Sequence, residues 1–221
     1  MARSRPTKLA PLPREFFARD ARLVARELLG KLLVRVMDGS GEMLSGRIVE
    51  AEAYLGGVDP GAHSYRGMTP RNAVLFGPPG HAYVYFIYGN HYCTNVSCHP
   101  EGETGCGVLL RALEPVAGIA RMATLRGVAL SPEPKPSQLR LLTSGPGRLS
   151  QALAITRAEH NDVDLCSVKS GLYMADDGSP APQTQATVRI NVTSAPHDLW
   201  RYIVPGNVFV SGPRNVRAES L

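Results

Sequence analysis

Apolar and polar residues alternate along several segments of the chain, a pattern that predicts β-strands. It is clear at residues 186–192, where Val188, Ile190 and Val192 are separated by polar residues. Gly89-Asn90 favours a tight turn between two runs of β-forming residues, which are therefore expected to pair as a β-hairpin. The strands predicted in this way span residues 31–36, 43–54, 83–88, 92–97 and 107–113.

Helical spacing of apolar residues occurs at residues 20–29, where Asp20 can cap the start and Gly30 can end the helix. Glu114-Pro115 is predicted to open a second helix that runs to about residue 126. A third, short helix is expected at residues 148–154. Strands and helices are mixed along the chain without a break in composition, which predicts one α+β domain at residues 14–215.

Other segments are rich in Gly and Pro. Residues 1–13 are basic and Pro-rich, and we expect them to form a flexible N-terminal arm. Residues 56–80 contain a single helical hint at Thr69-Pro-Arg-Asn72, with Thr as the cap and Pro at the first helical position. Residues 127–143 include the run Ser-Pro-Glu-Pro-Lys-Pro, which predicts a mobile loop.

The composition is that of an ordinary folded domain. Of the 221 residues, 43% are apolar and 19% are charged, which argues against intrinsic disorder. No apolar run approaches the roughly 20 residues of a membrane-spanning helix, so none is expected. The net charge of +5 suits an anionic partner. Only four of the 24 basic residues are Lys, which leaves few amines for Schiff-base chemistry.

Three cysteines, Cys93, Cys98 and Cys106, lie near His91 and His99 and suggest a zinc site. The run has no C-x-x-C pair, however, and alternation along a strand would place Cys93 and Cys98 on opposite faces. Buried free thiols are therefore the favoured interpretation, with no metal.

The segment at residues 46–56 carries the most informative polar residues. On a strand, Glu50, Glu52 and Tyr54 would share one face, and the apolar residues between them the other. Two carboxylates and a phenol on one face of a strand that leads into a Gly-rich loop are suited to form one side of a catalytic site. A half-solvated strand of an antiparallel sheet would give the same pattern, and the segment alone favours that alternative.

The predicted hairpin concentrates tyrosines in a protein with an aromatic content of 6%. Tyr83 and Tyr85 would share a face, and Tyr88 would lie at the turn. Aromatic faces stack on nucleobases, and a bulky residue at a hairpin tip can wedge between base pairs. The alternative is an aromatic strand that faces the core, with Tyr88 on the surface.

Considered together, these segments resemble the alkyladenine (3-methyladenine) DNA glycosylases over about residues 14–211. The resemblance covers nearly the whole chain and depends on many motifs in a consistent order, which makes it specific. These motifs are Arg47-Ile-Val-Glu-Ala-Glu-Ala-Tyr-Leu-Gly56, Ala62-His-Ser64, Thr69-Pro-Arg-Asn72, Tyr83-Val-Tyr-Phe-Ile-Tyr-Gly89, Asn95-Val, Val108-Leu-Leu-Arg-Ala-Leu-Glu-Pro115, Ser144-Gly-Pro-Gly147 and Gln151-Ala-Leu-Ala-Ile155.

The resemblance implies a role for each matching residue. Glu52 matches the carboxylate that activates water, and Arg111 the basic residue that helps to hold that water. Tyr54 and His63 match residues packed around the flipped base, and Tyr85 matches the residue that stacks on its opposite face.

Further roles follow from the same resemblance. Asn95 matches a pocket residue that discriminates against the amino group of normal guanine, and Tyr88 matches the residue inserted into the duplex. Glu50, Tyr83 and Leu109 are expected to support the site, with Glu50 the internal rival of Glu52 as the base.

The implied fold is a single compact α+β domain with a curved antiparallel sheet, surrounding helices and a protruding DNA-inserting β-hairpin. The implied protein acts as a monomer on double-stranded DNA that contains damaged purines, with no cofactor and no membrane. It would be cytoplasmic and nucleoid-associated in a bacterium, or nuclear in a eukaryote. Two other classes remain open, namely a non-catalytic nucleic-acid-binding module and a formyl-transfer or RNA-binding domain of similar fold.

Overall fold

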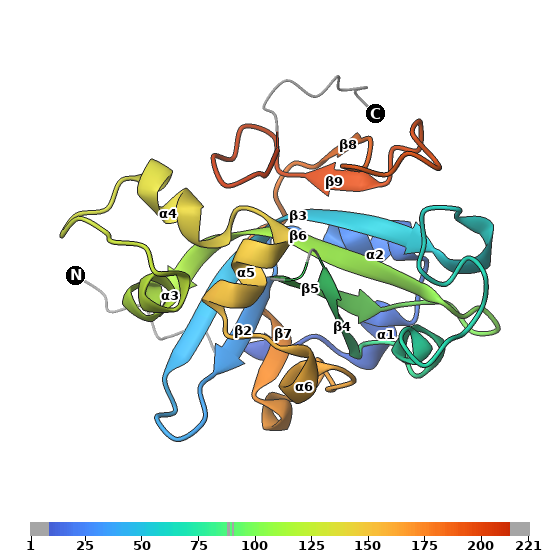
Figure 1. The fold of residues 1–221 in the computed structure, drawn as a ribbon, viewed down its shortest axis with the longest axis horizontal. Coiled ribbons are helices and arrows are strands. Elements are labelled where there is room, and N and C mark those ends of the chain that lie inside the picture. The colour runs from blue at the N-terminus through green and yellow to red at the C-terminus, as the bar shows by residue number, and fades with distance from the viewer. Residues whose placement is uncertain (1–8, 88, 90, 213–221) are drawn as a thin grey trace.

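The computed structural model describes residues 9–87, 89 and 91–212 of the chain. In this part of the chain, nine strands pair antiparallel in one strongly curved sheet (Figure 1). The strands are β1 (Ala10–Pro11), β2 (Leu32–Val36), β3 (Met43–Leu55), β4 (Ala82–Ile87), β5 (His91–Ser97), β6 (Cys106–Ala117), β7 (Leu172–Asp176), β8 (Gln185–Thr187) and β9 (Arg201–Ile203).

The helices cover the sheet and gather at its ends (Figure 1). Helix α2 packs against β3, α5 packs against β5, and α3, α4 and α5 pack against one another. The helices are α1 (Arg14–Phe17), α2 (Ala21–Glu27), α3 (Ile119–Arg126), α4 (Pro136–Thr143), α5 (Pro146–Ala152) and α6 (Arg157–His160), with 3₁₀ turns η1 (Gly56–Val58), η2 (Ala73–Phe76) and η3 (Val168–Ser170). None of the helices described is long and apolar enough to cross a membrane.

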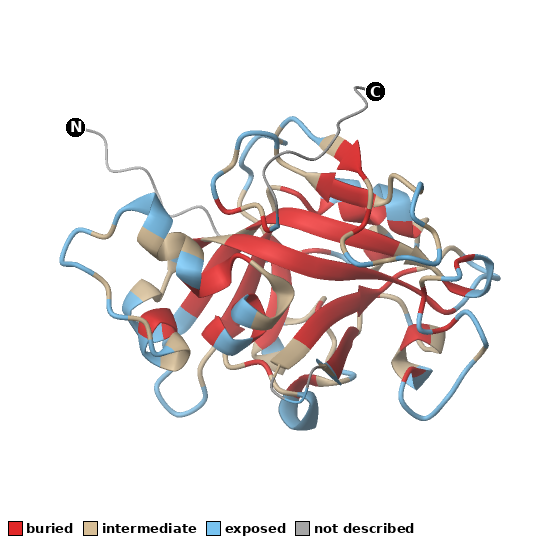
Figure 2. Cartoon of the chain, turned by 45° about the horizontal axis from the view of Figure 1, so that its top comes forward, coloured by how far each residue is buried: buried red, intermediate tan, exposed pale blue. Residues whose placement is uncertain are grey.

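Strands β3 and β6 form the buried centre of the molecule (Figure 2). Ile48, Ala51 and Ala53 of β3 point into the main core, where Val24 of α2 and Leu28, which follows this helix, also pack. Strand β6 pairs along one edge of β3, and the other edge is shared by β2 over the first half of β3 and by β9 over the second half. The predicted single α+β domain with a curved antiparallel sheet is therefore confirmed.

The order of the strands is β1-β7-β2-β3-β6-β5-β4, so that β4 is the last strand of the path. Residues 161–164 run beside its outer edge. The Ala82 N–H donates to the Val163 carbonyl at 2.9 Å, and the Val84 N–H donates to the Asn161 side chain at 3.0 Å. The free edge of β4 is thus covered by a segment of the same chain.

The helix predicted to begin at Glu114-Pro115 is wrong in its first turn. Strand β6 continues to Ala117, and Pro115 pairs with Gly46 next to a register shift in β3. Pro is tolerated in a sheet at such irregularities because the missing N–H breaks no regular ladder bond. Gly118, with φ of 73°, then turns the chain into α3.

Three other predictions differ from the structure in part. Residues 127–143 are not a loop throughout, because Pro136 opens α4 from the first helical position. The end of the predicted flexible arm is ordered, since Ala10–Pro11 pairs with β7 and Leu12 is buried. The strand predicted at residues 186–192 ends at Thr187. Beyond it, the Ile190 N–H donates to Glu52, and Asn191 adopts a φ of 61°, which is incompatible with an extended strand.

Candidate active site

Two carboxylates of β3, Glu50 and Glu52, are fully buried. The Tyr54 hydroxyl donates to Glu52 Oε2 at 2.9 Å, so that Glu52 and Tyr54 share a face as predicted. Arg111 of β6 contacts both carboxylates. Its Nε donates to Glu50 Oε1 at 2.9 Å, and its Nη1 donates to Glu52 Oε2 at 3.2 Å. One guanidinium therefore fixes the two carboxylates relative to each other.

The register of the strands explains how Arg111 reaches both groups. Strand β3 is irregular around Glu50, which pairs with Ala112, while Ala51 pairs with Leu110. Arg111 lies between these two pairs as the extra residue of β6. A bulge of this kind redirects a side chain at the cost of regular pairing.

Glu50 is held from behind by groups that are distant in sequence. Arg201 Nε donates to Glu50 Oε1 at 2.7 Å, and the Ser211 N–H donates to Glu50 Oε2 at 2.6 Å. Arg201 Nη2 donates to the Ser211 carbonyl at 3.0 Å, which closes the cluster. Glu50 thus fixes Arg111 and Arg201 but is set back from solvent.

Glu52 differs from Glu50 in where its partners lie. Besides Tyr54 and Arg111, the Ile190 N–H donates to Glu52 Oε1 at 2.7 Å. All three of these partners line the main cavity, whereas Arg201 does not, and neither carboxylate itself forms part of the lining. Glu52 is thus the carboxylate directly behind the cavity wall.

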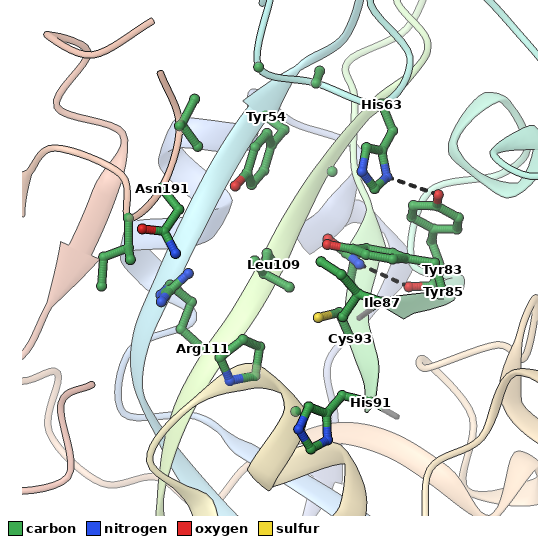
Figure 3. A pocket seen from close by; sticks show the side chains of 18 of the residues that line it. Tyr54, His63, Tyr83, Tyr85, Ile87, His91, Cys93, Leu109, Arg111 and Asn191 are labelled. Atoms are coloured by element: carbon green, nitrogen blue, oxygen red, sulfur yellow. Dashed lines mark hydrogen bonds between the residues drawn. The ribbon is translucent and has the colours of Figure 1, made fainter. Parts of the chain in front are cut away.

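The main cavity has a volume of ≈ 450 Å³. Figure 3 shows Tyr54 and Arg111 on one side and the tyrosines of β4 on the other. Residues 190–192 lie beside Glu52 on the first side, residues 61–64 contribute His63 to the second side, and residues 144–148 around the start of α5 also line the cavity. The Ser144-Gly-Pro-Gly147 motif therefore lies at the cavity.

Three aromatic rings form the second side. The His63 and Tyr85 ring centroids lie 4.6 Å apart in an edge-to-face arrangement, and those of Tyr83 and Tyr85 lie 5.3 Å apart. His63 Nδ1 lies 3.1 Å from the Tyr83 hydroxyl, which connects the loop at residue 63 to β4 (Figure 3). Both tyrosines are buried and point to the same face of β4, as predicted.

Asn95 and Leu109 lie beneath these rings. Asn95 pairs with Tyr83 across the hairpin, and its Nδ2 donates to the Tyr83 carbonyl at 3.0 Å, which fixes the orientation of the amide. Leu109 pairs with Asn95 on one side and with Glu52 on the other. It therefore joins the two sides of the cavity.

The rings of Tyr54, His63 and Tyr85 are neutral near pH 7. Burial raises the pKa of Tyr54 far above its usual range, and the negative charge of Glu52 raises it further. Burial likewise raises the pKa of Tyr85. Burial lowers the pKa of His63, and the nearby Arg71 guanidinium lowers it further. A cationic ligand would therefore meet uncharged ring faces.

Tyr88, predicted to enter the duplex, lies outside the described residues. Strands β4 and β5 pair as a hairpin as far as Ile87 and His91. Protrusion of the hairpin and its insertion into DNA stay predictions.

The cysteines are free thiols. Cys93 lies beside Tyr85 at the cavity and Cys98 lies in the main core, so the two occupy opposite faces. Within the described ranges, no three His, Cys, Asp or Glu side chains come together in a group that could hold a metal ion.

The chain also matches known proteins along most of its length. The family model of methylpurine-DNA glycosylase (MPG) matches residues 15–208. The chain belongs to this family. A relative from Koribacter versatilis (strain Ellin345) is 58% identical over 214 residues, which cover 97% of this chain and 99% of the relative.

Other members of the methylpurine-DNA glycosylase family are somewhat more distant. A Burkholderia lata relative is 50% identical over 205 residues, with 92% of each chain covered. A Clostridium botulinum (strain Hall) relative is 45% identical over 204 residues, which cover 90% of this chain and 98% of the relative. All three relatives carry the name "Putative 3-methyladenine DNA glycosylase".

Several residues at the site of this family member were not predicted from its sequence. Arg201 holds Glu50, the Ile190 backbone holds Glu52, and Arg189 lies against Tyr54. Their sequence neighbours carry no motif that marks them. The one weak signal for Arg189 and Arg201 is that each is a basic residue between two apolar residues. In an Arg-rich chain this signal is not specific enough to identify them.

Proposed function

We propose that this protein is a DNA-repair glycosylase that takes damaged purines, flipped out of duplex DNA, into the main cavity and hydrolyses their N-glycosidic bond. The observation that carries the proposal is the presence, in one cavity, of neutral aromatic rings opposite a buried carboxylate whose three hydrogen-bond partners line the wall. A base stacked in a duplex cannot be reached by such groups, so the nucleotide has to be extruded.

The rings would bind the base. Tyr85 would stack on one face, with Tyr54 and His63 packed around the other. Alkylation at a ring nitrogen makes a purine cationic, and a cation against an aromatic face gains about 0.5–2 kcal/mol per contact. Asn95 would discriminate against the amino group of normal guanine. The candidate bases are 3-methyladenine, 7-methylguanine, etheno-adenine and hypoxanthine.

The carboxylate would perform the chemistry. Glu52 would take a proton from a water held with the help of Arg111, and the oxygen of that water would attack the anomeric carbon as the bond to the base breaks. The negative charge of Glu52 would also stabilise the oxocarbenium-like transition state. Tyr54, Arg111 and Ile190 surround Glu52 on the cavity side, so this is where the water would have to lie.

The other predicted residues would act in support. Tyr88 would fill the space that the extruded nucleotide leaves in the duplex. Glu50 would hold Arg111, and Tyr83 would hold His63. Leu109 would form part of the cavity wall. The protein would act as a monomer and without a cofactor.

The reaction is proposed to be monofunctional, without lyase activity. None of the described lysines lines the cavity, and Lys31 donates to Asp176 at 2.5 Å on a different part of the sheet. Lys8 lies outside the described residues. Because no described lysine lies at the cavity, a Schiff base with the sugar is not expected.

The test is release of free base from a panel of duplexes, each containing one candidate lesion. Release from at least one lesion, with no adduct trapped by borohydride, supports the proposal. Binding without release from any lesion would instead favour a non-catalytic DNA- or RNA-binding domain. The Tyr88→Ser variant adds a further comparison, because it should lose most activity on tightly paired lesions and least on mispaired ones, which open at lower cost.

A further inference from the structure

A buried ion pair lies behind the cavity and outside the set of predicted site residues. Arg189 Nη1 donates to Asp59 Oδ2 at 2.6 Å, and Arg189 Nη2 donates to Asp59 Oδ1 at 2.8 Å. Both side chains are fully buried. Nη1 also donates to the Ala53 carbonyl of β3 at 3.0 Å. This is the forked geometry that only a guanidinium can supply to a carboxylate.

Asp59 orders the loop that leads to His63. Its carboxylate accepts from the Leu55 N–H at 3.1 Å and from the Gly61 N–H at 2.8 Å. The loop passes directly over the ion pair, because a Cβ on Gly61 would lie 3.0 Å from Arg189 Nη2 and 2.7 Å from Val192 Cγ1. Residues 61–64 line the cavity immediately afterwards.

Arg189 contacts the other functional groups from the opposite direction. Its guanidinium carbon lies 4.7 Å from the Tyr54 ring centroid and 4.8 Å from the Trp200 ring. The next residue, Ile190, donates its N–H to Glu52 at 2.7 Å. One side chain therefore connects the loop of His63, the ring of Tyr54 and the backbone that holds Glu52.

We propose that Arg189 is a positioning residue for the base-excision reaction, and that its forked bond to Asp59 sets the placement of Tyr54 and of the Ile190 N–H relative to Glu52. The inference rests on the proposed function. Buried ion pairs contribute little net stability, because desolvation of the charges offsets their attraction. What the fork supplies is orientation, and a displacement of about 1 Å at a reacting group costs about 10²-fold in rate.

The deciding variant is Arg189→Lys, which keeps the charge and loses the fork. The matched control is Arg47→Lys. Arg47 forms a similar forked pair with Asp177 (2.7 and 3.3 Å) and also donates to the Gly30 carbonyl at 2.7 Å, but it does not line the cavity. Both variants are compared with the wild type for single-turnover base release, half-saturating enzyme concentration and melting temperature.

We expect Arg189→Lys to lower the saturating single-turnover rate about 10- to 100-fold, with little change in the half-saturating concentration. Arg47→Lys should release base at the wild-type rate. Equal rates for the two variants, both folded at the assay temperature, would overturn the inference.

Two further measurements keep the inference testable if Arg189→Lys does not fold. Asp59→Asn breaks the fork from the other side, keeps the size of the side chain and should reproduce the rate loss. Trp200 is the single tryptophan, so its fluorescence reports the stacking of Arg189 in the folded state. The emission should change in the Arg189 and Asp59 variants and not in Arg47→Lys.

A wild type that releases no base would overturn the proposed function together with this inference. An active wild type with an Asp59→Asn variant of equal activity would overturn the inference alone.

Discussion

The two sides of the cavity are held in different ways. The polar side, formed by Tyr54 and Arg111 in front of the buried Glu52, is fixed by charge-assisted hydrogen bonds of 2.7–3.2 Å. The aromatic side, formed by His63, Tyr83 and Tyr85, is fixed by ring contacts of 4.6–6.1 Å and one hydrogen bond. Hydrogen bonds to charged groups depend strongly on distance and direction, whereas ring contacts tolerate small displacements.

This difference suits the two sides of the cavity to different tasks. A side of the cavity held by strict geometry suits a chemical step, in which one proton must move between two atoms. A side held by broad contacts suits the recognition of several bases of similar size. Substitutions on the polar side should therefore change the rate, and substitutions on the aromatic side should change which base is bound.

The largest effect is expected for Glu52→Gln. The amide keeps the shape of the side chain but cannot accept a proton, so the single-turnover rate should fall roughly 10²- to 10⁴-fold. Binding to lesion DNA, measured by fluorescence anisotropy, should be retained. Near wild-type release by this variant, together with an inactive Glu50→Gln, would exchange the roles of the two carboxylates.

Glu50→Gln should act mainly on stability. The amide group would face the N–H donors of Arg111, Arg201 and Ser211, and the buried guanidinium of Arg201 would lose its ion pair. Breaking such a pair costs about 3–5 kcal/mol in the free energy of unfolding. Denaturant titration measures this loss, and the rate per folded molecule should fall less than in Glu52→Gln. A variant of unchanged stability would show that Glu50 is not a structural anchor.

A smaller effect is expected for Tyr85→Leu on the aromatic side. Loss of the ring face removes about 0.5–2 kcal/mol of attraction to a cationic base, which corresponds to about 2- to 30-fold in preference over a neutral base. Competition between 7-methylguanine and hypoxanthine duplexes measures this preference. Tyr85→Phe keeps the face and serves as the control. Equal losses on both bases would mean that Tyr85 contributes packing alone.

The smallest effect is expected for Arg71→Ala. Burial and the Arg71 charge lower the pKa of His63, so the folded protein binds this proton less readily than the unfolded chain. The stability from neutral His63 is complete above about pH 6.5 and is lost as the pH falls toward the lowered pKa. Arg71→Ala should raise that pKa and reduce this loss. NMR titration of the His63 ring checks the direction, and an unchanged pKa would assign the shift to burial alone.

Much of the fold follows from local pattern. The alternation along β3 predicted the shared face of Glu52 and Tyr54, and the turn at Gly89-Asn90 predicted the pairing of β4 with β5. Local pattern gave the wrong prediction at Pro115, which lies in strand β6 and not in a helix. The proline is accommodated by an irregular register of the neighbouring strand β3, which the sequence around Pro115 does not encode. Local pattern failed again at residues 188–192, where the Ile190 N–H bonds to Glu52 instead of to a strand.

The site was predicted less completely than the fold. The resemblance to a known family supplied Glu52 and Arg111, but Arg189 and Arg201 contact the carboxylates of residues 50–59 from more than 100 positions along the chain. A partner at that separation has no local sequence pattern. Such ion pairs become visible only once the sheet brings β9 and its neighbouring segments against β3.

The covered edge of β4 has a consequence for how the protein behaves in concentrated solution. Exposed edge strands with many aromatic and β-branched residues can pair with a second chain and start aggregation. Strand β4 contains Tyr83, Val84, Tyr85 and Phe86 in succession. The Asn161 side chain accepts the Val84 N–H in the position that a neighbouring strand would otherwise occupy. Tyr83 and Tyr85 can thus line an open cavity while the backbone that carries them is shielded from a second molecule.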